Sequence, residues 1–265
     1  MRALWSAATG MLAQQLNVDT VANNLANINT TGFKASRLEF QDLIYQHLPS
    51  PGSVQGGQPP AALLQVGHGV QPVATQRLFS QGSLEPTDNP LDLAIQGRGF
   101  FQVELPGGTR AYTRDGSFKL DAEGNLVTSN GYRLVLEDGE EVPLEADALE
   151  VAADGTITAV VRDDDGEVTR TEIGRINLAT FINPAGLQAM GQNLFLATPA
   201  SGEPETARPG EGGVGYIQQG YLEASNVNVV QEMVALIVAQ RAYEMNSKAI
   251  QASDEMMGLA NNLRR

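Results

Sequence analysis

The sequence predicts an α+β protein in which long helices at the two ends of the chain pair as a coiled coil. An antiparallel all-β domain lies between them, joined by irregular extended segments. Three observations support this prediction. Apolar residues recur at heptad spacing at both ends, short β-rich runs alternate with turn dipeptides in the middle, and Pro/Gly-rich stretches separate these regions.

The N-terminal segment is predicted to be a helix from about residue 2 to residue 27. Its apolar positions alternate between spacings of four and three residues over about three heptads, which is typical of a coiled-coil seam. The seam consists of Leu4, Ala8, Met11, Gln15, Val18, Ala22 and Leu25. Residues 27–32 then end the helix, because Asn and Gly tolerate the left-handed backbone found at helix C-termini.

The C-terminal segment, from about residue 226 to residue 263, is predicted to be a second helix of the same kind. Its seam consists of Val229, Met233, Leu236, Gln240, Tyr243, Ser247, Ile250 and Met257, with Asp254 as an interruption. Val230, Val234 and Ile237 form a second apolar stripe beside the seam. A helix with two apolar stripes is expected to pack against more than one neighbour.

The middle of the chain is predicted to be an antiparallel β domain built from short strands. Dipeptides such as Asp154-Gly155 supply the positive φ that hairpin turns need. The strand candidates are 100–105, 110–114, 126–128, 132–136, 157–161 and 173–181.

The chain is therefore expected to divide into three parts. Residues 1–32 and 224–265 form a terminal helical part, 33–90 and 196–223 a connecting part, and 91–195 a β-rich outer part. Within the connecting part, residues 46–69 are rich in Pro, Gly and Gln and are expected to be irregular.

Charge and composition exclude several classes of function. The chain has 17 Lys+Arg against 31 Asp+Glu, a net charge of −14, and no Cys. The first 48 residues are neutral and the last 44 carry −1, so residues 49–221 hold the remaining −13. The acidic balance argues against nucleic acid and anionic membranes as partners. No apolar run is long enough to span a membrane, and the N-terminus lacks the pattern of a cleaved signal peptide.

No residue pattern predicts catalysis, a cofactor or a metal site. The best metal candidate is the acidic run 163–166, but the first calcium-ligand position would be Val161, so we expect a solvated hairpin tip. His47 and His68 are expected to be surface or packing residues. A carbohydrate-active enzyme would need two carboxylates across a cleft, and no such pair is indicated.

The candidate functional residues are those expected to contact other copies of the chain. One pair of long helices cannot cover both stripes of the C-terminal helix, which favours assembly through the ends. The candidates on the apolar stripes are Leu4, Met11, Val18, Leu25, Met233, Leu236, Ile237, Tyr243 and Ile250. The amides of Asn23, Asn24 and Asn27 either fix the register between subunits or form only a cap and turn.

Several motifs resemble those of bacterial flagellar rod and hook proteins. They are 22–34 (ANNLANINTTGFK), 80–84 (SQGSL) with 92–95 and 97–101 (GRGFF), 112–118 (YTRDGSF), and 220–229 (GYLEASNVNV) followed by 240–244 (QRAYE). Within this family the chain is most similar to the proteins of the distal rod, because residues 45–70 match an extra stretch that hook proteins generally lack. A proximal rod protein or a short hook protein remains the alternative.

The resemblance implies a structural subunit that polymerises into a helical tube. In such a tube the terminal helices form the inner layer around an export channel, and the β domain lies outside. The implied location is the basal body, in the rod that crosses the periplasm and transmits torque to the hook, after export without signal cleavage. The implied partners are other copies of the chain, proximal rod and hook proteins at the ends, ring proteins around the rod, and the export apparatus and rod cap. A monomeric binding module that uses the β domain is the remaining non-enzymatic alternative.

Overall fold

The computed structural model describes residues 2–48, 64–137, 148–162 and 168–262, and the chain forms two compact units. The helical unit contains Met1–Ala26, Ser36–Arg77 and Asn228–Arg265, and the β unit contains Asn27–Ala35 and Leu78–Val227. This grouping differs from the expected three parts, because residues 36–77 of the connecting part join the helices and its remainder joins the β-rich part.

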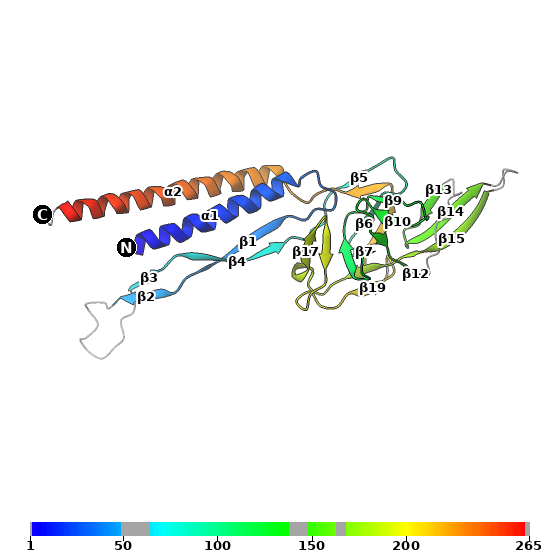
Figure 1. The fold of residues 1–265 in the computed structure, drawn as a ribbon, viewed down its shortest axis with the longest axis horizontal. Helices are drawn as coiled ribbons and strands as arrows, with labels where there is room; N and C mark the ends of the chain where they lie inside the picture. Colours follow the sequence, from blue (N-terminus) through cyan, green and yellow to red (C-terminus); the bar gives the residue numbers. More distant parts are fainter. Residues whose placement is uncertain (1, 49–63, 138–147, 163–167, 263–265) are drawn as a thin grey trace. The chain divides into compact units, whose positions relative to one another are not determined.

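The helical unit is built on α1 (Arg2–Ala26) and α2 (Val229–Asn262), which lie side by side and run antiparallel (Figure 1). A helix was predicted at each end, and both are present. Asn228 caps the start of α2, since its side-chain Oδ1 accepts hydrogen bonds from the backbone N–H groups of Val230 (3.1 Å) and Gln231 (3.2 Å).

Small side chains make the contact between α1 and α2. Ala7 and Val21 of α1 and Ala239 of α2 are buried, and a Cβ atom on Gly10 would lie 2.8 Å from Nδ2 of Asn246. Small residues let two helix axes approach closely. Ala7, Gly10 and Val21 each lie one residue before a position of the predicted seam, so the seam itself runs along the flank of this contact.

A long two-stranded ribbon completes the helical unit. Strand β1 (Ser36–Asp42) pairs antiparallel with β4 (Val70–Arg77), β2 (Tyr45–Leu48) pairs with β3 (Leu64–Gly67), and α1 packs against β1 and β4. The ends of segment 46–69, which were expected to be irregular, are thus strands. Pro72 is accommodated in β4 beside a bulge at Glu39 and Phe40. Residues 49–63 lie outside the described part of the chain.

The main sheet of the β unit has nine strands among the described residues. The strand order is β17-β18-β8-β7-β11-β10-β9, with β16 pairing to both β7 and β19. The strands are β7 (Phe100–Glu104), β8 (Arg110–Thr113), β9 (Phe118–Leu120), β10 (Leu126–Thr128), β11 (Arg133–Leu134), β16 (Leu178–Thr180), β17 (Gln188–Gly191), β18 (Leu194–Leu196) and β19 (Glu205–Ala207). A 3-10 helix, η1 (Pro184–Gly186), precedes β17.

Smaller antiparallel sheets surround the main one. A four-stranded sheet has the order β12-β15-β14-β13, and two pairs are β20 with β6 and β21 with β5. The strands are β5 (Leu84–Pro86), β6 (Leu93–Gln96), β12 (Leu136–Glu137), β13 (Ala148–Val151), β14 (Thr156–Arg162), β15 (Val168–Ile176), β20 (Tyr216–Gln219) and β21 (Tyr221–Glu223). The prediction of a mostly antiparallel β middle is therefore confirmed, and each of the six strand candidates overlaps a strand. The acidic run 163–166 lies outside the described residues.

Strand β7 shows how the sequence fills the β unit. Successive side chains of a strand point to opposite faces, and in β7 both faces are buried. Phe101 and Val103 belong to the larger hydrophobic cluster, whereas Phe100 belongs to a second cluster on the other face. Edge-to-face ring contacts stabilise both faces, with centroid distances of 5.2 Å from Phe101 to Phe118 and 5.7 Å from Phe100 to Phe181.

Candidate assembly surface

The first three turns of α2 carry a continuous exposed apolar patch. Five side chains that are each more than half exposed form the apolar patch: Val230, Met233, Val234, Ile237 and Val238. With 3.6 residues per turn, the same face of α2 continues with charged and polar residues. These are Arg241, Glu244, Lys248, Gln251 and Glu255, all of them exposed. Monomeric soluble proteins rarely expose such contiguous apolar surface.

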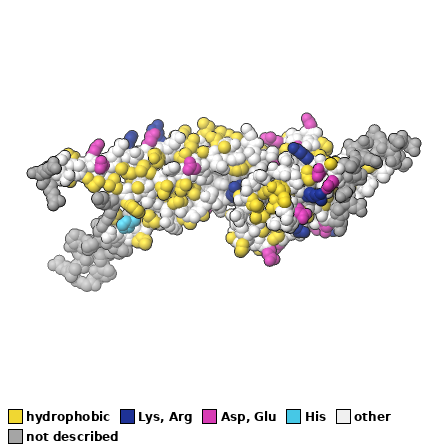
Figure 2. All heavy atoms as spheres, viewed as in Figure 1, with side chains coloured by type: hydrophobic (Ala, Val, Ile, Leu, Met, Phe, Trp, Pro, Cys, Tyr) yellow, Lys and Arg dark blue, Asp and Glu magenta, His cyan; other side chains and the backbone are white. Residues whose placement is uncertain are grey.

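Helix α1 adds exposed apolar side chains of its own. Trp5 is 64% exposed, and Leu12 and Leu16 are also exposed. Each follows a position of the predicted seam by one residue, so the seam pattern alone missed them. Figure 2 shows hydrophobic side chains along the viewed face of the helical unit.

The predicted interface residues divide into three groups by exposure. Leu4, Met11, Val18, Leu25, Asn27, Leu236 and Ile250 are half-buried. Asn23, Met233, Ile237 and Tyr243 are exposed. Asn24 is buried. The first two groups retain surface for contact with another copy, and their role stays a prediction.

Asn24 forms hydrogen bonds within its own chain, and its part in subunit contacts stays a prediction. Its Nδ2 donates to the carbonyl oxygen of Ser36 at 2.8 Å, and its Oδ1 accepts from the backbone N–H of Ser36 at 2.9 Å. Nδ2 also lies 3.3 Å from Oε2 of Glu232 on α2. The amide therefore forms with Ser36 the two backbone hydrogen bonds that a neighbouring strand would otherwise form. These bonds connect α1 to β1.

We predict that Asn24→Ala lowers the stability of the helical unit by roughly 1–3 kcal/mol, because it leaves both backbone groups of Ser36 without these bonds. Urea unfolding followed by far-UV circular dichroism measures the change. Gln15→Ala, at an exposed position of the same helix, should shift stability by less than about 0.5 kcal/mol. If the two variants unfolded at the same urea concentration, the hydrogen bonds between Asn24 and Ser36 would contribute nothing to stability.

The β unit contains a buried cluster of three charged side chains. Nζ of Lys34 lies 2.6 Å from Oε1 of Glu223, and Nη1 of Arg114 lies 3.1 Å from Oε2 of the same carboxylate. Each cation also donates to a backbone oxygen. Nζ of Lys34 donates to Ser80 at 2.8 Å, and Nη2 of Arg114 donates to Gly97 at 2.7 Å. Two cations therefore share one carboxylate out of contact with water.

Burial dominates the electrostatics of this cluster. Loss of water lowers the pKa of Lys34, an effect that repulsion from Arg114 reinforces and the carboxylate of Glu223 opposes. Burial likewise lowers the pKa of Arg114, against the opposing effect of Glu223. Among the described residues, Glu223 is thus the carboxylate that pairs with both cations.

The motifs that carry the family resemblance meet at this cluster. Lys34, Arg114 and Glu223 come from motifs 22–34, 112–118 and 220–229. The backbone N–H of Gly82, from motif 80–84, donates to Oε1 of Glu223 at 2.8 Å. Gly97, from motif 97–101, provides the carbonyl that accepts from Arg114. The cluster therefore joins segments that precede, form and follow the main sheet.

Two glycines in these motifs permit close backbone approach. A Cβ atom on Gly82 would overlap the carbonyl oxygen of Ala224, and one on Gly116 would overlap that of Leu93. Asn226, in motif 220–229, adds a side-chain bridge, since its Oδ1 accepts from the N–H of Ala35 at 2.7 Å and its Nδ2 donates to the carbonyl of Leu78 at 2.7 Å. These motifs are thus packing and hydrogen-bonding devices.

Among the described residues there is no group of three or more His, Asp or Glu side chains placed to hold a metal ion. Within the same residues, neither helix is both long and apolar enough to cross a lipid bilayer.

Three family descriptions match separate parts of the chain. "Flagella basal body rod protein" matches residues 4–34, "Flagellar hook protein FlgE/F/G D1 domain" matches 94–159, and "Flagellar basal body rod FlgEFG protein C-terminal" matches 218–263. The three ranges cover α1, part of the β unit including Arg114, and the segment from Glu223 through α2.

Whole-chain relatives carry corresponding names. The chain is 49% identical over 268 aligned residues to the flagellar basal-body rod protein FlgG of Borreliella burgdorferi, covering 100% of this chain and 99% of the relative. It is 46% identical to FlgG of Caulobacter vibrioides and 34% identical to the flagellar hook-basal body complex protein FlhP of Bacillus subtilis. Both of these alignments cover 100% of each chain.

Proposed function

We propose a mechanism of assembly from one premise: this chain belongs to the flagellar basal-body rod protein family and is a structural subunit of the distal rod. Copies of the chain bury the exposed apolar faces of α1 and α2 against one another and so build a helical polymer. The observation that supports this proposal is the apolar patch on α2, which the described residues of the helical unit leave exposed.

Burial of the patch contributes favourable free energy to association. Full burial of one Val, Ile or Met side chain contributes roughly 1.5–3 kcal/mol. Five side chains that are each more than half exposed therefore offer on the order of 5 kcal/mol at each subunit contact. A slipped register would expose part of this surface again, and this resistance to slippage is what a shaft under torque requires.

The helix faces also suggest how copies are arranged. Small residues bring α1 and α2 together, so the larger side chains of both helices remain for neighbouring copies. We assign the coiled-coil contacts to these outer and flanking faces, with Leu4, Met11, Val18 and Leu25 on α1 and Met233, Leu236, Ile237, Tyr243 and Ile250 on α2. The charged continuation of α2 favours a single register through pairs of opposite sign.

We extend the proposal to the location and the partners of the subunit. The polymer lies in the basal body, crosses the periplasm and encloses the export channel. Proximal rod proteins and the hook protein adjoin its two ends, ring proteins surround it, and the export apparatus and rod cap act during assembly. Export without cleavage preserves α1, which the assembly requires.

The apolar patch can be tested with a pair of variants that add the same charge to one face of α2. We predict that Val234→Asp abolishes polymer formation at concentrations where the unaltered chain assembles, because a carboxylate cannot be buried unpaired. Gln251→Asp, on the charged continuation of that face, should still polymerise. Negative-stain electron microscopy and sedimentation measure both. Normal polymers from Val234→Asp would refute assembly through the patch.

A further inference from the structure

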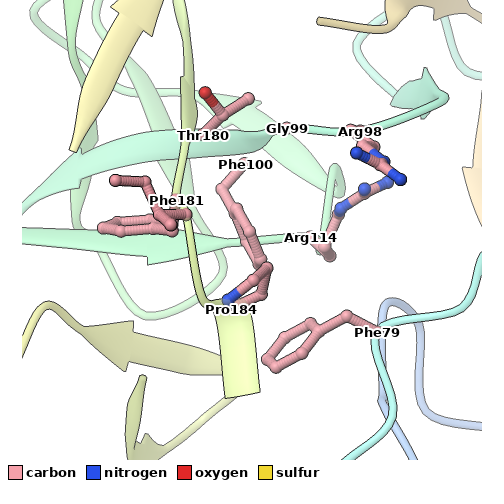
Figure 3. A pocket seen from close by; sticks show the side chains of 9 residues that line it. Phe79, Arg98, Gly99, Phe100, Arg114, Thr180, Phe181 and Pro184 are labelled. Carbon is pink, nitrogen blue, oxygen red and sulfur yellow. The ribbon is translucent and has the colours of Figure 1, made fainter. Parts of the chain in front are cut away.

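A cavity of about 290 Å³ opens beside the buried charge cluster of the β unit. Phe79, Phe100 and Phe181 contribute aromatic walls, with centroid distances of 5.4 Å between Phe79 and Phe100 and 5.7 Å between Phe100 and Phe181. Figure 3 shows the side chains of Arg98 and Arg114 on one side of this space and the rings around the rest.

The cavity has an uncompensated positive charge. Arg114 is only 5% exposed, and its Cζ lies 5.4 Å from the ring centroid of Phe100. Its buried Nε has no hydrogen-bond partner among the described residues. Arg98 is exposed and forms no ion pair within the described part of the chain. The carboxylate of Glu223, which pairs with Arg114, is already shared by two cations.

We propose that this cavity receives an acidic side chain from a second copy of the chain. A carboxylate there would face the guanidinium of Arg98, which presents donors in the planar geometry that carboxylates match. It would also offset the excess positive charge beside Arg114 in surroundings that water screens poorly. The CH₂ groups of Asp or Glu would pack against the phenylalanine rings.

The second copy is the occupant that the charges of the chain favour. Residues 49–221 carry a net −13, so the middle of a neighbouring copy presents mainly acidic side chains. Pockets for small-molecule ligands commonly have volumes of about 300–1,000 Å³. The cavity, at about 290 Å³, lies at the lower end of this range and is therefore of a size for one side chain. Ile182 also lines the cavity and is 83% exposed, which provides an apolar contact at its mouth. This inference rests on the proposed self-assembly.

The absence of Cys from the chain allows a direct test. The full-length variant Ile182→Cys has a single thiol, which can carry a benzophenone maleimide cross-linker. Polymers made from a mixture of isotope-labelled and unlabelled copies are irradiated and analysed by mass spectrometry. We expect cross-links between copies, to peptides that contain Asp or Glu. Cross-links within one copy only, or to peptides that lack acidic residues, would overturn the proposal.

Variants of Arg98 supply the energetic test. Arg98→Glu should raise the lowest concentration at which polymers form by about tenfold or more, as expected for loss of a close interfacial charge pair. Arg98→Lys should cause a smaller increase, and Arg110→Glu, at an exposed arginine elsewhere in the β unit, should cause none. An unchanged threshold for Arg98→Glu would refute the proposal. If the unaltered chain forms no polymer, self-assembly fails and this inference with it; if polymers form regardless of Arg98, only this inference fails.

Discussion

Replacing Glu223 with glutamine is expected to destabilise the β unit by roughly 3–5 kcal/mol, because the change leaves Lys34 and Arg114 buried without a compensating charge. Glutamine has nearly the same shape, so no cavity forms, and its oxygen can still accept from Gly82. The loss therefore reports the charge together with one hydrogen bond, because an amide nitrogen cannot accept from Nη1 of Arg114 as Oε2 of Glu223 does. Differential scanning calorimetry of the full chain should show the transition of the β unit lowered by on the order of 10 °C.

The matched control for this variant is Glu85→Gln. Glu85 is exposed on β5 and pairs with Leu222, the residue that precedes Glu223 in β21. Its change should alter stability by less than about 0.5 kcal/mol. If both variants unfold at the same temperature as the unaltered chain, the buried cluster is not what holds the junction of β5, β8 and β21 together.

Gly116→Ala is expected to disrupt the β unit more severely still, by more than about 4 kcal/mol, since the added methyl group overlaps the carbonyl of Leu93. The backbone of 116 cannot withdraw without cost, because its carbonyl accepts hydrogen bonds from the N–H groups of Leu93 and Phe118, both at 3.0 Å. Poor soluble yield and rapid limited proteolysis between residues 92 and 118 would report the loss.

The matched control for Gly116→Ala is Gly258→Ala, which makes the same substitution at a position without a steric overlap. Among the described residues, no atom outside the neighbouring backbone of α2 lies within 4 Å of a Cβ atom at position 258. Alanine is a better helix former than glycine by about 1 kcal/mol, so stability should stay equal or rise. A Gly116→Ala protein as stable and protease-resistant as Gly258→Ala would contradict the close packing of β6 against the 116–118 turn.

The elements with strong local patterns were the ones that the sequence could predict. Heptad spacing located α1 and α2, and Asp154-Gly155 marked a turn in which Gly155 has a φ of +83°. Strands β1 and β4 were missed because most of their side chains are exposed and the apolar alternation in β1 is limited to Leu38 and Phe40. Their pairing depends on contact with α1, which no local pattern records.

The buried charge cluster of the β unit could not be predicted from the sequence for a related reason. Lys34, Arg114 and Glu223 are separated by 80 residues or more, and a charged residue gives no sign of its partner across such a distance. The motifs marked these residues only as features of a family. For the amide of Asn24 the sequence left a cap and turn or a subunit contact open, and it did not indicate the hydrogen bonds to Ser36 of the same chain. The role of each of these side chains depends on a contact with a residue that is distant in the sequence or in another element.

The fluorescence of Trp5 tests the proposed assembly most directly. Trp5 is the single tryptophan of the chain and is 64% exposed on α1. If the helix faces become buried between copies, the emission maximum should move to shorter wavelength on polymerisation, and quenching by acrylamide should decrease. A polymer whose Trp5 has the same emission and the same quenching as the monomer would contradict the account.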